Sequence, residues 1–154
     1  MGVEIERKFL VSSEQWREGV ERSVEIKQGY LSTVPERTVR VRTKGDKGFL
    51  TIKGKTQHLS RAEFEYEIPL QEALGLLKLC EGHPVEKVRY EVSVGGKLWE
   101  IDVFEGKNAG LVLAELELEA EEEAFEMPTW AGEEVSADLR YFNSYLSQHP
   151  FKGW

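Results

Sequence analysis

Polar and apolar residues alternate along most of the chain, and the alternation has the two-residue period of a β-strand. Short turns rich in glycine separate several of the alternating segments, which is typical of antiparallel strands. The pattern predicts eight strands, over residues 3–11, 24–33, 38–43, 49–55, 61–68, 85–94, 97–105 and 111–120. We therefore predict an α+β fold dominated by β-structure, in which an eight-stranded antiparallel sheet closes, or nearly closes, into a β-barrel.

Four short helical segments are predicted besides the strands. Leucines at helical spacing predict a helix over residues 70–82, and residues 12–16 have the pattern of a capped short helix or turn. The acidic run at 121–123 is expected to start a third helix, and Ser136 is expected to cap a fourth. The apolar stripe of this last helix would consist of Leu139, Phe142 and Leu146. The leucine-rich helix and the last helix would cover outward apolar faces of the sheet.

The first strand has one apolar face and one charged face. Glu4, Glu6 and Lys8 share the charged face, because successive side chains of a strand alternate sides. Two carboxylates one residue apart can both reach one hard cation, and a lysine beside them can hold an anion that the cation also binds. Arg7 points to the opposite, outer face, where we expect a surface or interface ion pair.

The charged faces of the other strands are sorted by sign. An ordinary exposed face mixes signs, since like charges side by side destabilise a sheet. The sorted residues are the acids Glu63, Glu65, Asp102, Glu115 and Glu117 and the bases Arg40, Arg42, Lys53, Lys87 and Arg89. Collected in one lumen, so many acids cannot all stay ionised without cations. Two divalent cations would make the lumen positive and suited to a polyanion. Oxygen-only ligands favour Mg²⁺ or Mn²⁺ over zinc.

Length, charge and cysteine content narrow the class of protein. A chain of 154 residues can bury one core, and we expect residues 1–154 to form a single domain. The net charge of −8 argues against nucleic acid as a partner, and no apolar run approaches the roughly 18 residues of a membrane helix. A single cysteine, Cys80, provides no disulfide framework, so we expect a cytoplasmic protein.

The ordered set of charged motifs resembles the CYTH, or triphosphate tunnel metalloenzyme, superfamily. The Glu-x-Glu-x-Lys motif at 4–8 is similar to the signature of that family. The resemblance covers nearly the whole chain through Gln-Gly-Tyr-Leu at 28–31, Arg-x-Arg at 40–42, Lys53, Glu-x-Glu at 63–65, Glu-Lys-x-Arg-Tyr at 86–90, Asp-Val-Phe at 102–104, Glu-x-Glu at 115–117, Glu-Glu-Val at 133–135 and Arg-Tyr at 140–141. It implies an eight-stranded antiparallel tunnel with a charged lumen that binds triphosphate groups together with divalent metal.

The resemblance also suggests a role for each charged residue. The phosphate ligands would be Lys8, Arg40, Arg42, Lys53, Lys87 and Arg89, and the metal ligands would be Glu4, Glu6, Glu115, Glu117 and, in support, Asp102. Glu63 and Glu65 would bind a second metal or position the attacking water, so that the catalytic residues would be Lys8, Arg42, Glu63 and Glu65. Two Mg²⁺ or Mn²⁺ ions per site and a homodimer are implied.

The chain most resembles short bacterial members that hydrolyse inorganic tripolyphosphate to diphosphate and phosphate. Three alternatives stay open from the sequence. One is a lyase similar to class IV adenylate cyclases, which makes cyclic AMP from ATP. The others are a thiamine triphosphatase and a non-catalytic polyphosphate-binding domain. The tunnel recognises the triphosphate that all these ligands share, so the charged motifs alone do not choose among them.

Overall fold

The computed structural model describes residues 2–154, which form nine strands, two α-helices and four 3-10 helices. The strands are β1 (Gly2–Val11), β2 (Val20–Ser32), β3 (Arg37–Lys44), β4 (Lys47–Gly54), β5 (Ser60–Ile68), β6 (Glu81–Val94), β7 (Lys97–Phe104), β8 (Val112–Glu117) and β9 (Ala131–Glu134). The helices are η1 (Gln15–Gly19), α1 (Leu70–Leu77), η2 (Gly106–Asn108), η3 (Leu139–Tyr141), α2 (Asn143–Gln148) and η4 (Phe151–Gly153). No helix among these residues is long and apolar enough to cross a membrane.

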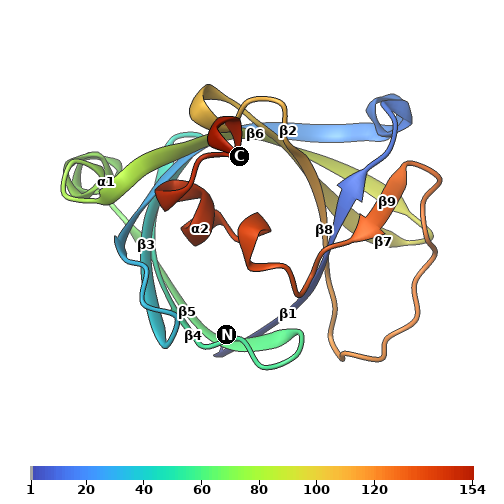
Figure 1. Ribbon diagram of the computed structural model, residues 1–154, viewed down its shortest axis with the longest axis horizontal. Coiled ribbons are helices and arrows are strands. Elements are labelled where there is room, and N and C mark those ends of the chain that lie inside the picture. Colours follow the sequence, from blue (N-terminus) through green and yellow to red (C-terminus); the bar gives the residue numbers. More distant parts are fainter. Residues whose placement is uncertain (1) are drawn as a thin grey trace.

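Eight of the strands close into an antiparallel barrel, which confirms the predicted fold. The strand order is β5-β4-β3-β2-β6-β7-β8-β1, and β1 pairs again with β5 to complete the ring seen in Figure 1. The seam is divided along β1, because Ile5 pairs with Ser60 of β5 while Lys8 pairs with Glu115 of β8. β1 thereby pairs with both β5 and β8, and these two pairings close the barrel.

The ninth strand was not predicted. β9 runs along the second half of β1, where Phe9 pairs with Glu134, on the edge of β1 that β5 leaves free. Its four residues, Ala-Gly-Glu-Glu, have no apolar alternation, so the two-residue period gave no signal. Arg7 donates to Glu134 with Nη1–Oε1 3.0 Å apart, which confirms the predicted outward ion pair.

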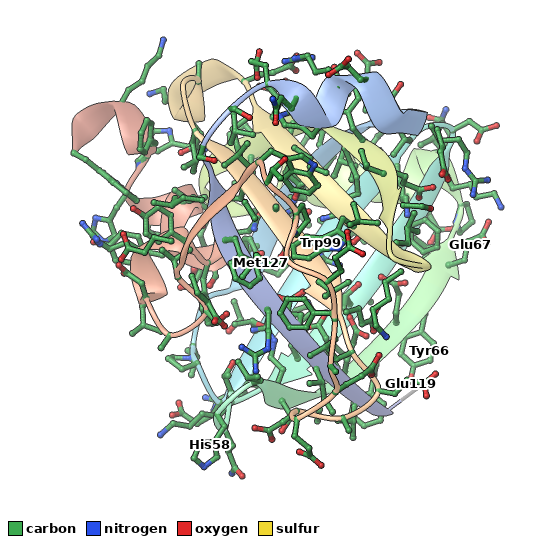
Figure 2. The ribbon with its side chains drawn as sticks, turned by 90° about the vertical axis from the view of Figure 1, so that its right-hand side faces the viewer. His58, Tyr66, Glu67, Trp99, Glu119 and Met127 are labelled. Carbon is green, nitrogen blue, oxygen red and sulfur yellow. The ribbon has the colours of Figure 1, made fainter. Side chains whose placement is uncertain are left out.

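One hydrophobic core lies outside the barrel wall. It is centred on Phe9 and Trp99, whose ring centroids are 5.5 Å apart, and on Trp130, 5.5 Å from Trp99. The segment between β8 and β9 covers this core, and Figure 2 shows Trp99 beside the part of that segment that carries Met127. Phe125, in the same segment, places its ring 5.9 Å from that of Trp99. The apolar outer face of β1, β7 and β8 is thus covered by extended chain.

A second hydrophobic core closes one end of the barrel. Leu113, Val85 and Phe104 from the barrel pack with Tyr141 and Leu146 from the C-terminal segment. In Figure 1 α2 therefore lies within the outline of the ring. The prediction that the last helix covers an outer face was wrong, because its apolar residues complete a core at the barrel end.

Three further details of the helix predictions were wrong. Ser136 caps no helix: its Oγ accepts a hydrogen bond from the backbone N–H of Lys8 at 2.9 Å. Leu139 is 66% exposed and belongs to no buried stripe. Residues 121–123 form a turn, which is held by a hydrogen bond from the backbone N–H of Glu119 to Glu123 at 2.7 Å. The leucine-rich helix α1 does exist, but it ends at Leu77 because β6 begins at Glu81.

Candidate active site

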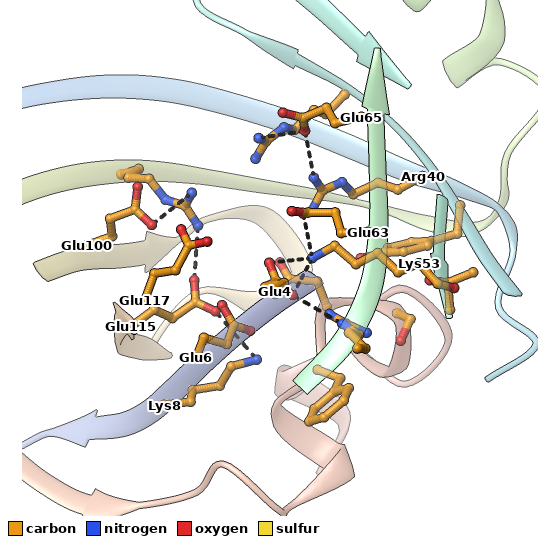
Figure 3. Close-up of a pocket in the computed structure, with 18 of the residues that line it drawn as sticks. Glu4, Glu6, Lys8, Arg40, Lys53, Glu63, Glu65, Glu100, Glu115 and Glu117 are labelled. Atoms are coloured by element: carbon orange, nitrogen blue, oxygen red, sulfur yellow. Dashed lines mark hydrogen bonds and ion pairs between the residues drawn. The ribbon is translucent and has the colours of Figure 1, made fainter. Parts of the chain in front are cut away.

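A charged cavity of about 230 Å³ lies inside the barrel (Figure 3). Its charged lining consists of eight cationic side chains (Lys8, Arg40, Arg42, Lys44, Lys53, Arg61, Lys87 and Arg89) and seven carboxylates (Glu4, Glu6, Glu63, Glu65, Glu100, Glu115 and Glu117). These residues occupy alternate positions on their strands, so the same alternation that places apolar side chains outward places charges inward. Every predicted site residue except Asp102 lines this cavity.

Glu4 is held by two cations at the junction of β1, β4 and β5. Lys53 Nζ lies 3.0 Å from its Oε2, and Arg61 Nε lies 3.2 Å from its Oε1. Burial would raise the pKa of Glu4, but Lys53 and Arg61 outweigh burial and lower it to about 2. Glu4 is therefore ionised and anchored, with Lys53 also 3.6 Å from Glu63 Oε2.

Glu6 stands in the opposite situation. Its carboxylate forms no hydrogen bond or ion pair with any residue between 2 and 154. Burial and the neighbouring carboxylates of Glu115 and Glu4 raise its pKa to about 8. A carboxylate crowded by like charges, and lacking a protein cation of its own, is a group that a bound metal cation would stabilise.

The carboxylates of the cavity are suitable ligands for a hard cation, although they do not converge on one point. Within residues 2–154, no three acidic, histidine or cysteine side chains converge as a ready metal cluster. Among these carboxylates Glu115 is paired with cations, since it lies 3.0 Å from Arg89 and 3.7 Å from Lys8. Figure 3 shows Glu115, Glu117 and Glu6 side by side in the cavity. These are all oxygen donors, which is the chemistry that Mg²⁺ and Mn²⁺ require.

Asp102 lies behind the cavity wall and is 1% exposed. Lys87 Nζ donates to its Oδ2 at 2.7 Å, and Arg89 donates to both carboxylate oxygens at 2.8 and 2.9 Å. Burial would raise the pKa of Asp102, but Arg89 and Lys87 outweigh burial and hold it well below its usual range. This position favours a role in holding the two cations over the predicted role in metal binding.

Two arginines of β3 crowd one side of the cavity. Arg42 and Arg40 approach the same oxygen of Glu65, at 3.3 and 3.5 Å, and Thr51 Oγ1 donates to that oxygen at 2.9 Å. Burial, with the nearby charges of Arg40 and Arg89, lowers the pKa of Arg42 to about 10. Glu65 thus orients a cationic pair that has more positive charge than its partner neutralises, as an anion site requires.

The C-terminal segment supplies the end wall of the cavity. Phe142, Asn143 and Ser144 line it, and the backbone carbonyl of Tyr141 accepts a hydrogen bond from Lys8 Nζ at 3.0 Å. Sequence reasoning missed this wall, because a residue outside the strands is placed by tertiary packing alone. It also missed Lys44 and Arg61, which strand alternation could have found: Arg61 shares the inward face of β5 with Glu63 and Glu65.

Three comparisons with known proteins show what the chain as a whole is similar to. The CYTH domain family model matches residues 2–146. An inorganic triphosphatase of Acetivibrio thermocellus is 46% identical over 100% of this chain and 99% of its own length. An inorganic triphosphatase of Nitrosomonas europaea is 40% identical over 94% of this chain and 96% of its own length. The crystal structure of an inorganic triphosphatase superposes with a TM-score of 0.69 at 38% identity, covering 96% of this chain and 95% of that chain.

Proposed function

This chain belongs to the CYTH domain family, and on that premise we propose that it is a metal-dependent hydrolase of inorganic tripolyphosphate. The products would be diphosphate and phosphate. The observation that carries the proposal is the cavity itself, in which eight cationic side chains and seven carboxylates face one another inside a closed barrel. Such a lining can hold a polyanion and a divalent cation together, which is what phosphoryl transfer needs.

Four of the proposed phosphate ligands are oriented in pairs, each pair by one carboxylate. Lys87 and Arg89 are oriented by Asp102, and Arg40 and Arg42 are oriented by Glu65. All four line the cavity, where a guanidinium or ammonium group can donate to phosphate oxygens. Lys8 and Lys53 complete the set, from β1 and β4. We propose that these six residues neutralise the triphosphate and stabilise the charge that develops on the leaving diphosphate.

The carboxylates of β1 and β8 would hold the metal. Glu6, Glu115, Glu117 and Glu4 offer only oxygen donors, so Mg²⁺ or Mn²⁺ is the proposed ion, with two per site. CYTH triphosphatases are generally metal-dependent. When bound, the ion would neutralise phosphate oxygens and lower the pKa of a water molecule.

Glu63 and Glu65 lie on β5, on the same inward face as Arg61. We propose that they position the attacking water in line with the terminal phosphorus, where one of them accepts its proton. The new bond joins the water oxygen to that phosphorus, and the bond that breaks joins the same phosphorus to the bridging oxygen. Diphosphate leaves with the electron pair of the broken bond.

A homodimer and a cytoplasmic location also remain proposals, as does a single domain over residues 1–154. Support for the dimer comes from the outer face of β1, β4 and β5, away from the Gly48 end of β4 against which Ala73 of α1 packs. Val3, Ile52, Phe64 and Tyr66 are exposed there, and a contiguous apolar patch of this kind marks an interaction surface. Light scattering of the purified chain would test the proposal, because a monomeric mass across a concentration series would contradict it.

The experiment that tests the function is a substrate panel with product identification. Tripolyphosphate, ATP and thiamine triphosphate are each incubated with Mg²⁺ or Mn²⁺, and the products are identified by phosphorus NMR. We expect the highest kcat/KM for tripolyphosphate, with diphosphate and phosphate as products. Formation of cyclic AMP from ATP would indicate a lyase, and a preference for thiamine triphosphate would indicate a thiamine triphosphatase. Tight binding without turnover would indicate a non-catalytic binding domain.

A further inference from the structure

Asn143 brings a neutral side chain into an otherwise charged cavity. It is the first residue of α2 and lines the cavity at the end closed by the C-terminal segment. Its Oδ1 accepts two hydrogen bonds, from Gln28 Nε2 at 2.8 Å and from Lys87 Nζ at 3.1 Å. Gln28 is fully buried, so this contact ties the amide of Asn143 firmly to the barrel wall.

These two contacts determine which way the amide of Asn143 is turned. A lysine ammonium has three N–H donors and no acceptor, so the amide atom that faces Lys87 must be the oxygen. The same oxygen then accepts from Gln28, and rotating the Asn143 amide by 180° would direct its NH₂ group at an ammonium. The orientation therefore follows from chemistry and needs no observation of hydrogens.

The NH₂ group of Asn143 consequently has no protein partner. Within residues 2–154, Nδ2 donates to no acceptor. It is also not one of the fully buried polar atoms without a partner, so the unpaired group is accessible. An unpaired donor that is accessible from a cavity, next to the ammonium of Lys87, faces the place where an anion is expected.

We propose that Asn143 Nδ2 donates a hydrogen bond to an oxygen of the bound triphosphate, which makes it a neutral substrate ligand beside Lys87. The inference rests on the proposed function, since it assumes that the cavity holds a triphosphate. Asn143 would fix the position of one phosphate group without adding charge. Because it belongs to the C-terminal segment, substrate would contact that segment as well as the barrel strands.

The decisive variant is Asn143→Asp, which has nearly the same shape. It keeps an oxygen for Lys87 and Gln28 but replaces the cavity-facing donor with a negatively charged acceptor. We expect KM for tripolyphosphate to rise at least tenfold, equal to about 1.4 kcal/mol, while the melting temperature of the substrate-free protein does not fall. If Asn143 serves only to hold Lys87, the carboxylate will hold it as well or better. An unchanged KM would then overturn the proposal.

Gln148→Glu is the matched control, since it adds the same charge to the same helix at an exposed residue outside the charged cavity. We expect its KM to stay within twofold of the unsubstituted protein. An equal rise in both variants would overturn the proposal, because it would show an effect of charge alone.

A binding measurement separates this proposal from the proposed function. The side-chain NH₂ resonance of Asn143, assigned by comparison with Asn143→Asp, is followed by nitrogen-15 NMR during titration with metal-free tripolyphosphate. We expect a saturable shift. A shift in this titration, together with no hydrolysis once Mg²⁺ or Mn²⁺ is added to the same sample, would overturn the function and support the ligand. Hydrolysis with an unmoved resonance at saturation would overturn the ligand alone.

Discussion

Asp102 offers the sharpest test of how the cavity is built. Asp102→Asn keeps the size of the side chain but removes the negative charge that faces Lys87 and Arg89 at 2.7 to 2.9 Å. Breaking a buried ion pair by removing one partner costs about 3–5 kcal/mol, because the other charge stays buried without compensation. A chain of this size loses about 2–4 °C per kcal/mol. We therefore expect the melting temperature of the metal-free protein to fall by roughly 6–20 °C.

Glu100→Gln is the matched control for this variant. Glu100 lies on the same strand and approaches the same arginine, but more loosely, at 3.4 Å, and its side chain is 30% exposed. We expect a loss of less than about 1 kcal/mol, as for other solvent-accessible pairs. Both melting temperatures are measured by calorimetry without divalent metal. If Asp102→Asn were as stable as the unsubstituted protein, or more stable, Asp102 would not be the anchor of these cations. A metal-binding role, in which losing charge relieves repulsion, would then be the better explanation.

Three further predictions test other parts of the cavity. Arg42→Ala should abolish tripolyphosphate hydrolysis while changing the melting temperature by less than about 3 °C, because the loss of the ion pair with Glu65 is offset by the loss of repulsion from Arg40. A large fall in melting temperature would instead indicate that Arg42 belongs to a structural ion pair. Glu6→Gln should raise the melting temperature of the metal-free protein, because it removes a crowded carboxylate, yet lower activity and weaken Mg²⁺ binding in titration calorimetry; a less stable variant would contradict this. Arg7→Ala should leave kcat/KM unchanged and cost about 1 kcal/mol or less in denaturant unfolding, and a loss of activity would place Arg7 in the site.

The inward residues could be predicted because a strand repeats every two residues. Once the alternation assigns one member of a strand to the lumen, as with Glu4, every second residue follows, and the closed barrel brings these rows together. The same rule separated Arg7 from its neighbours correctly. The metal-binding role of Asp102 stays a prediction, but its burial could not be foreseen, because parity assigns a face of the strand and does not say which inward residue is covered by its neighbours' side chains.

The C-terminal segment could not be predicted in the same way. The function of Asn143 depends on the distance of its Oδ1 from Lys87, a residue 56 positions earlier, and no local period encodes that contact. The helix that contains Asn143 was predicted too long, because the sequence indicates Ser136 as its cap. The hydroxyl of Ser136 instead accepts a hydrogen bond from the backbone N–H of Lys8 in β1. Local signals compete with tertiary hydrogen bonds at such positions, and here the tertiary bonds prevail.

The divided seam of β1 has a consequence for how the chain folds. β1 is synthesised before the other strands, yet Lys8 pairs with Glu115 of β8. Half of β1 therefore cannot pair until residues more than a hundred positions later have been synthesised. Pairings this distant in sequence form slowly, which leaves the apolar side of β1 open to other chains in the meantime. Glu4, Glu6 and Lys8 interrupt that stretch with charge, as gatekeeper residues do in segments prone to aggregation. The charges that line the finished cavity would thus also keep the nascent strand soluble.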